Sequence, residues 1–244
     1  MPYIAGLDVH DILRRSPLSH EQGVESIVFL TTLVSIGGGI RNHLKASSRH
    51  RHHGHVTNTG IAAPSGKNIG EKQQVPLSVK ILGPLAHGFI FIPPVMYLAG
   101  TALGRLQQPD WLYAFSLPSD DLTVGQLATV KTLAAFAHFG VLYLLKHTRK
   151  HFRAAKKSEK PEVPDKGPYS VVRHPMSSAI LLSQTTFALM WWNWIPLAGV
   201  ALTAGYLAVS LPHEEQVQEH DVATGVQYTA YKQKVAYRLI PYVW

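Results

Sequence analysis

Long apolar stretches separated by polar connections dominate the 244-residue chain. Five of them approach the roughly 20 mostly apolar residues that a helix needs to cross a lipid bilayer. They span residues 24–40, 81–103, 127–145, 176–192 and 195–211, and Pro93-Pro94 is expected to interrupt the second. This spacing predicts an all-α, polytopic membrane protein with about five transmembrane helices. A soluble helical bundle with buried core helices is the alternative interpretation.

The connections differ in charge between the two expected faces of the membrane. Residues 41–79, residues 146–166 and the tail after residue 211 are basic, whereas residues 104–126 hold one arginine against three aspartates. Basic connections beside transmembrane segments generally face the cytosol. We therefore expect an integral membrane protein with a cytosolic C-terminal segment. Contact with membrane lipid then accounts for the net charge of +8, and no nucleic-acid partner is expected.

The remaining composition limits the chemistry. The chain has no cysteine, which excludes disulfides, thiolate metal sites and a cysteine nucleophile. Residues 46–75 are rich in Ser, His, Gly, Asn and Pro and are predicted to form a mobile loop. Its cluster His50, His52, His53 and His55 lacks carboxylate or cysteine companions, so a solvated basic loop near anionic headgroups is favoured over a metal site. We divide the chain into an N-terminal segment, 1–79, and a membrane core, 80–244.

Turn-forming and basic residues gather just before the fourth apolar stretch. Gly167-Pro168 predicts a turn. His174 precedes a proline, which disfavours helical geometry at that histidine, and Pro175 suits the first turn of the next helix. Arg173 and His174 are thus expected at the cytosolic mouth of a membrane helix, either as a headgroup anchor or as part of a site.

An acidic pair, Glu214-Glu215, is expected directly after the fifth helix. Glutamates at that position meet the negative end of the helix dipole, so a nearby cation would stabilise them. The tight hairpin predicted between the fourth and fifth stretches, which contains three tryptophans, brings the pair back beside Arg173 and His174. A solvated helix exit is the alternative interpretation.

The end of the chain contains a third group of residues with regular spacing. Tyr228, Tyr231 and Val235 are spaced to share one face of a helix. We expect an amphipathic cytosolic helix that packs over the membrane mouth, or one that lies in the headgroups without a catalytic role.

Taken in order, these motifs are Gly-x-Tyr-x-x-x-Arg-His-Pro, an apolar hairpin, Glu-Glu, Gly-x-x-Tyr-x-x-Tyr and a closing Ile-Pro. The order resembles the isoprenylcysteine carboxyl methyltransferase family, whose wider relatives are membrane phospholipid methyltransferases, over roughly residues 125–244. The resemblance implies an S-adenosyl-L-methionine pocket built from the last membrane spans and the cytosolic C-terminal segment. It implies methylation of the C-terminal carboxylate of a prenylated cysteine, in the endoplasmic reticulum membrane.

The resemblance also assigns residues to the pocket. The implied cofactor-binding residues are Glu162, Val163, Gly167, Tyr169, His174, Pro175, Met176, Ser177, Glu215 and Tyr228. The chain departs from the family at Ser177, where tyrosine is usual. It also has Pro212-His213 before Glu214, where the family commonly has an arginine that helps to hold the substrate carboxylate.

The expected reaction needs little proton chemistry. An acceptor carboxylate is already ionised at neutral pH, so the site has to align the reactants and exclude water. Carboxylates and tyrosine rings suit a sulfonium, and a cation is needed to hold the acceptor. The candidate catalytic residues are Arg173, Glu214 and Arg238, with Arg173 preferred for the acceptor and a protonated His213 as a further substitute.

Two other functions stay open. The acceptor could be another lipophilic molecule, such as a phospholipid amine or a terpenoid acid, and an amine would require His174 or His213 as a base. The chain could instead be a catalytically silent membrane scaffold or lipid-binding protein, which Ser177 and the missing arginine favour. The expected partners are therefore membrane lipid and either a prenylated protein or a lipophilic small molecule.

Overall fold

The computed structural model describes residues 3–4, 7–8, 20–50, 76–156 and 162–244. Its five long helices are α2 (His20–His50), α3 (Leu77–Leu103), α5 (Val124–Lys156), α6 (Pro175–Trp191) and α7 (Trp194–Glu219). The short helices are α4 (Asp110–Tyr113), the 3₁₀ turn η1 (Gly167–Ser170) and α8 (Gly225–Lys234), and two two-residue strands, β1 (Tyr3–Ile4) and β2 (Leu7–Asp8), pair near the N-terminus. The predicted helical class is confirmed.

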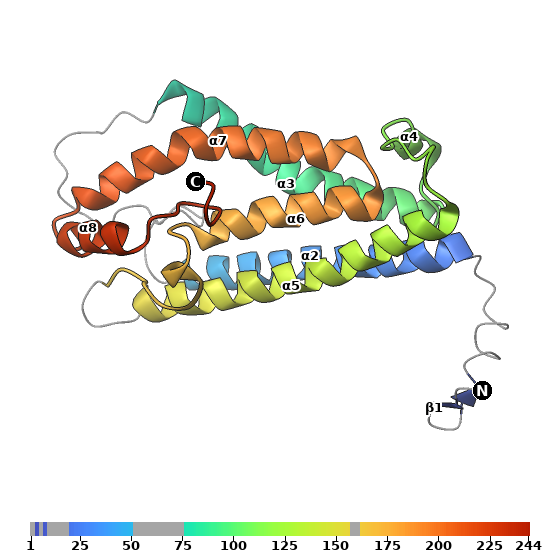
Figure 1. Ribbon diagram of the computed structural model, residues 1–244, viewed down its shortest axis with the longest axis horizontal. Helices are drawn as coiled ribbons and strands as arrows, with labels where there is room; N and C mark the ends of the chain where they lie inside the picture. The colour runs from blue at the N-terminus through green and yellow to red at the C-terminus, as the bar shows by residue number, and fades with distance from the viewer. Residues whose placement is uncertain (1–2, 5–6, 9–19, 51–75, 157–161) are drawn as a thin grey trace.

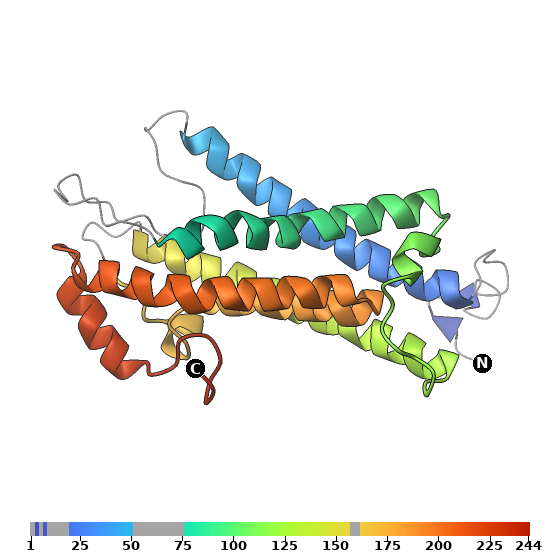
Figure 2. The ribbon, with the colours of Figure 1, turned by 90° about the horizontal axis from the view of Figure 1, so that it is seen from above.

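The five long helices lie lengthwise beside one another (Figure 1). α6 packs between α5 and α7, α3 packs on α7, and α2 packs on α5 and α3. Figure 2 shows α2 crossing the bundle obliquely. The α8 helix lies at one end of the bundle and α4 lies at the other (Figure 1).

Four of these helices are long and apolar enough to cross a membrane: α2 over Gln22–Arg41, α3 over Leu77–Leu103, α5 over Val124–Ala155 and α7 over Trp194–Glu219. The fourth predicted span, 176–192, corresponds to α6, which has 17 residues. A helix of that length rises about 26 Å, slightly less than the roughly 30 Å hydrocarbon core. The membrane character of the chain thus rests on four helices.

Several helices extend beyond their apolar stretches. The expected interruption of α3 at Pro93-Pro94 is wrong, because the helix continues through both residues and also contains Pro84. Such prolines are tolerated in membrane helices because neighbouring groups satisfy the freed backbone. The loop predicted from residue 46 is helical to His50, and the other histidines of its cluster lie outside the described residues. α3 begins at Leu77, and the domain division at residue 79 stays a prediction.

The predicted position of Glu214-Glu215, directly after the fifth helix, is wrong. α7 does not end near residue 211 but continues through Pro212 to Glu219, so Glu214 and Glu215 lie inside its last two turns. The acidic side chains of these last turns have cationic partners: Glu215 is surrounded by cations, and Lys232 pairs with Glu219.

The predicted hairpin between α6 and α7 is confirmed. Trp192 ends α6 in the left-handed region, at φ +52°, and the Asn193 side chain accepts a hydrogen bond from the Ile195 N–H at the start of α7. Asn193 is fully buried and donates through Nδ2 to the Leu112 carbonyl oxygen. The hairpin is therefore joined to the segment that carries α4.

A buried ionic network lies at this end of the bundle. The Glu25 carboxylate of α2 accepts hydrogen bonds from the Tyr97 hydroxyl of α3, at 2.6 Å, and from the Lys131 ammonium of α5, also at 2.6 Å. Gln108 donates to Glu25 and to the Trp191 carbonyl oxygen at the end of α6. The Glu25 carboxylate of α2 thus contacts α3 and α5 directly, and Gln108 links it to the end of α6. These contacts fix α2 in the bundle.

Removing the cation from this network is expected to destabilise the fold. Lys131→Met would leave the Glu25 charge buried without its ion-pair partner, which costs about 3–5 kcal/mol, and thermal unfolding in detergent should show a clear drop in Tm. The double variant Glu25→Gln/Lys131→Met removes both charges and should recover part of that loss. An unchanged Tm in the single variant would contradict a stabilising role.

Candidate functional site

The candidate site lies at the end of the bundle opposite the hairpin, where η1, the start of α6, the end of α7 and α8 meet (Figure 1). The chain enters it through Gly167, whose φ of +63° glycine adopts without strain. His174 is the N-cap of α6 and Pro175 is the first residue of that helix, as predicted. The N–H groups of Arg173 and His174 donate to the carbonyl oxygens of Tyr237 and Arg238, which ties the last residues of the chain to the start of α6.

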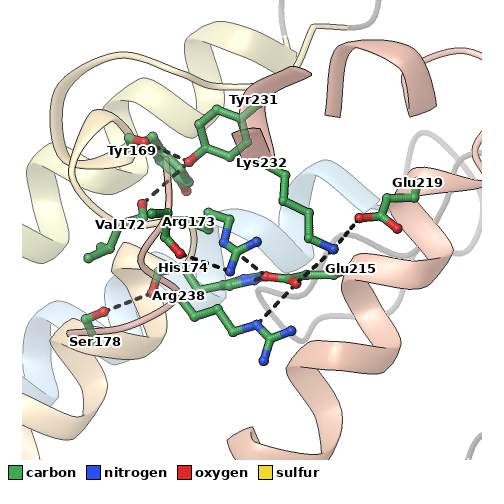
Figure 3. A network of polar contacts seen from close by, with 11 residues as sticks. Tyr169, Val172, Arg173, His174, Ser178, Glu215, Glu219, Tyr231, Lys232 and Arg238 are labelled. Atoms are coloured by element: carbon green, nitrogen blue, oxygen red, sulfur yellow. Dashed lines mark hydrogen bonds and ion pairs between the residues drawn. The ribbon is translucent and has the colours of Figure 1, made fainter. Parts of the chain in front are cut away.

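Glu215 is the centre of the site (Figure 3). Its side chain is 1% exposed. Oε1 lies 3.3 Å from Arg173 Nε and 3.2 Å from His174 Nε2, and Oε2 lies 3.2 Å from Arg238 Nε and 3.8 Å from Lys232 Nζ. A buried carboxylate requires such partners because the loss of water would otherwise strongly disfavour its charge. The prediction that the hairpin brings the acidic pair beside Arg173 and His174 is confirmed for Glu215.

The two arginines are held differently. Arg173 is 8% exposed, and besides Glu215 its terminal Nη2 donates to the Ala236 carbonyl oxygen at 3.3 Å. Arg238 is 25% exposed and contacts Glu215 through Nε, while its terminal amino groups point away from the carboxylate (Figure 3). Its guanidinium carbon lies 5.5 Å from the centre of the Trp244 ring. The amino groups of Arg238 are therefore better placed than those of Arg173 to meet a ligand.

A small cavity opens beside these arginines. Its volume is about 230 Å³, and it is lined by Arg173, Ala236, Tyr237, Arg238, Tyr242, Val243 and Trp244. This volume is below the range of about 300–1,000 Å³ that is usual for small-molecule sites. It suits the polar end of a ligand rather than a whole one.

A cluster of tyrosines adjoins the ionic network. Tyr169, Tyr228, Tyr231 and Val235 form a buried cluster with Phe152 and Val163 against it, so the predicted apolar face of α8 is confirmed. The Tyr231 hydroxyl donates to the Tyr169 carbonyl oxygen at 2.7 Å. Burial raises the pKa of the Tyr169, Tyr228 and Tyr231 hydroxyls above their usual range, so all three stay protonated at neutral pH.

One of these hydroxyls is distinctive. Tyr228 is 3% exposed, and its Oη makes no hydrogen bond within the described residues. An unpaired buried hydroxyl costs about 1–3 kcal/mol. It is thus a candidate for a group that donates to a ligand.

The other predicted residues lie at the margin of this arrangement. Val163 packs on the tyrosine cluster and Glu162 is exposed beside it. Met176 and Ser177 are half-buried in the first turn of α6. Glu214 is half-buried and has no ion-pair partner in the described part of the chain. The structure thus unites Tyr169, Tyr228, Arg173, His174, Glu215 and Arg238, and it does not bring Glu214 into the ionic network.

Two residues of the site were missed by sequence reasoning. Lys232 of α8 bridges Glu215 and Glu219, and the Ser178 hydroxyl donates to the Leu239 carbonyl oxygen at 2.6 Å. Lys232 directly follows Tyr231 on the predicted amphipathic helix, and this position could have indicated a place near the site. No linear motif includes Lys232, so it was not predicted. Within the described residues, no group of three or more His, Asp or Glu side chains could hold a metal ion.

Comparison with known proteins does not assign the chain to a family. No protein-family model matches the chain, and no curated protein matches it. Its function therefore has to be argued from the site's own chemistry.

Removing the central charge is expected to destabilise this end of the bundle. Glu215→Gln would leave Arg173 buried without its carboxylate, at a cost of about 3–5 kcal/mol, and Tm in detergent should fall accordingly. Glu219→Gln is the matched control on the same helix. Glu219 is 26% exposed, so losing its pair with Lys232 should cost under about 1 kcal/mol. Equal losses in the two variants would contradict the central role of Glu215.

Proposed function

We propose that the chain is a membrane-embedded, S-adenosyl-L-methionine-dependent methyltransferase that methylates the C-terminal carboxylate of a prenylated cysteine. The order of its motifs resembles the isoprenylcysteine carboxyl methyltransferase family. The observation that carries the proposal is the buried ionic network around Glu215, placed against a tyrosine cluster that contains an unpaired hydroxyl. In this proposal α6 is the fourth of five spans, and the basic end of the bundle faces the cytosol from the endoplasmic reticulum membrane.

The residue types of the tyrosine cluster suit the proposed cofactor. When bound, S-adenosyl-L-methionine supplies an activated methyl group on a positively charged sulfur. The tyrosine rings of the cluster offer the electron-rich faces that attract such a cation, and Tyr228 Oη offers a donor with no partner in the described structure. The backbone near Val163 closes the cluster on one side, where the Val163 N–H donates to the Gln227 side chain.

Glu215 acts in this proposal as a positioning residue. Its two oxygens are engaged by Arg173, His174 and Arg238, so its charge is balanced within the protein. It thereby fixes the guanidinium group of Arg238 and the imidazole of His174 at the mouth of α6. Glu214, one residue earlier, lies outside the ionic network.

The acceptor carboxylate is assigned to Arg238. The sequence favoured Arg173 for this role, but Arg173 is nearly buried, forms an ion pair with Glu215 and donates a hydrogen bond to the Ala236 carbonyl oxygen. Arg238 is more exposed, its terminal amino groups face away from Glu215 (Figure 3), and it lines the small cavity. A guanidinium fork can hold a carboxylate through two parallel hydrogen bonds. No base is required, because the acceptor is ionised at neutral pH.

An amine acceptor, such as a phospholipid amine, is the second candidate. It is favoured by the Pro212-His213 sequence where the family commonly has a carboxylate-holding arginine. His174 Nε2 is engaged by Glu215, which leaves half-buried His213 as the base that would remove the amine proton.

The two candidates and the silent-scaffold alternative are separated by one experiment. The purified full chain in detergent is given radiolabelled S-adenosyl-L-methionine with either N-acetyl-S-farnesylcysteine or phosphatidylethanolamine. We expect methyl transfer to the farnesylcysteine acid alone. Transfer to the amine alone would favour the second candidate. Failure to bind the cofactor would contradict both enzymatic functions.

Arg238→Lys tests the acceptor assignment. Lysine keeps a positive charge for Glu215 but lacks the planar fork, so Tm should change little. We expect kcat/KM for the farnesylcysteine acid to fall at least tenfold while cofactor affinity is retained. His220→Gln, an exposed position at the end of α7, is the control. Equal kcat/KM in Arg238→Lys and in the unaltered protein would return the role to Arg173.

Tyr228→Phe tests the cofactor assignment. Because the hydroxyl is buried without a partner, its removal should leave Tm unchanged or raise it slightly. If the hydroxyl donates to the cofactor, cofactor affinity measured by calorimetry should fall about tenfold. Tyr231→Phe is the contrasting variant, since it removes a hydroxyl bonded to the Tyr169 carbonyl oxygen and should lower Tm. Unchanged cofactor affinity in Tyr228→Phe would show that Tyr228 serves only in packing.

A further inference from the structure

Two histidines on α5 face each other outside the residues assigned to methyl transfer. His147 and His151 are one helical turn apart, both are half-buried, and their ring centres lie 4.7 Å apart. Their Nε2 atoms are 3.2 Å apart. The two nitrogen atoms are therefore close enough for a hydrogen bond between the rings, or for both to bind one ion.

This separation matches that of two ligands on one metal ion. Imidazole nitrogens bind late first-row metals at about 2.0–2.1 Å. Two such nitrogens 3.2 Å apart would subtend an angle of about 100° at the metal, between the values of square-planar and tetrahedral coordination. Histidines four residues apart on a helix are a known pair of metal ligands.

The two rings are also held in place from outside. Tyr143 stacks on His147, with ring centres 5.9 Å apart and planes 15° apart. Gly167 lies against His151: a Cβ atom at that position would be only 2.6 Å from His151 Nε2. The turn that begins η1 thus forms a wall of the pair, and the missing side chain leaves room for the imidazole. Fixed ligand orientation of this kind strengthens metal binding.

We propose that His147 and His151 form a chelating site for one divalent transition-metal ion, with Cu²⁺ bound more tightly than Ni²⁺ or Zn²⁺. Both Nε2 atoms bind the metal, the proton of each ring resides on Nδ1, and water fills the remaining positions. The site lies between α5 and the Gly167 turn, so a bound ion would brace that turn. The proposal does not depend on the methyltransferase function.

The surrounding charge sets the strength of the site. Lys146, Lys150 and Arg153 are exposed on the same turns of α5, and Arg149 is half-buried between them. These cations oppose a divalent ion, but the repulsion between exposed charges is screened over about 8 Å at physiological salt. Metal affinity should therefore increase with ionic strength, which is the opposite of the behaviour of a cation site built from surface carboxylates.

The test uses the full chain in detergent, without a histidine tag, in a background where His50, His52, His53 and His55 are replaced by alanine. This background removes the other sequence cluster of histidines. Cu²⁺ is titrated by calorimetry, and electron paramagnetic resonance counts the nitrogens on the bound ion. We expect one equivalent of Cu²⁺ with two nitrogen ligands, and affinity at least tenfold lower in His147→Gln and in His151→Gln. His220→Gln is the control and should bind as the background does.

The alternative is a hydrogen bond between the two rings with no metal affinity. Cu²⁺ binding that is equal in the background and in the double variant His147→Gln/His151→Gln would overturn the proposal. So would a signal from a single nitrogen ligand. Glutamine approximates the size of histidine, and Tm without metal identifies any variant that fails to fold. If a glutamine variant fails to fold, His151→Asn replaces it. We then expect Cu²⁺ to raise the Tm of the background protein but not that of His151→Asn, and an equal rise in both would overturn the proposal.

Discussion

The buried charge of Glu215 is the constraint on which the α8 end of the bundle depends. A carboxylate that is 1% exposed needs compensating charge, and its partners come from three separate parts of the chain: Arg173 and His174 before α6, Lys232 on α8 and Arg238 in the last segment. Backbone hydrogen bonds from residues 173–174 to residues 237–238 bring the first and last of these together. The end of α7, the start of α6 and the closing segment are therefore positioned by one side chain.

The helices could be predicted from the sequence because crossing a bilayer imposes a length and an apolar composition that are visible without a structure. Their ends could not, because polar turns at the end of a helix are held by partners that lie far away in the sequence. α7 thus extends past the apolar stretch to Glu219, and α3 continues through Pro93-Pro94. The same limit explains the misplaced acidic pair, which the sequence put outside α7.

The site was predictable only as far as local geometry determined it. Pro175 at the first turn of α6 follows from the preference of proline for that position, and the shared face of Tyr228, Tyr231 and Val235 follows from their spacing; both are confirmed. Arg173 and Arg238 differ in how deeply their guanidinium groups are buried. That burial depends on how the closing segment folds back on α6, which the sequence does not show. The bridge made by Lys232 depends in turn on the reach of a flexible side chain from α8.

A comparison of the two buried carboxylates separates a structural end of the bundle from an end that can bind a ligand. Glu25 and Glu215 lie near opposite ends of α6, and each connects several helices. The partners of Glu25 are a tyrosine hydroxyl, a glutamine amide and a lysine, and the Gln108 amide also reaches the Trp191 carbonyl oxygen. Around Glu215, by contrast, Arg238 lines a cavity and its terminal amino groups point away from the carboxylate, and the neighbouring Tyr228 hydroxyl has no partner in the described structure. Donors that remain unused in a buried, positively charged setting suit an anionic ligand, which is why the proposed function is placed at this end of the bundle.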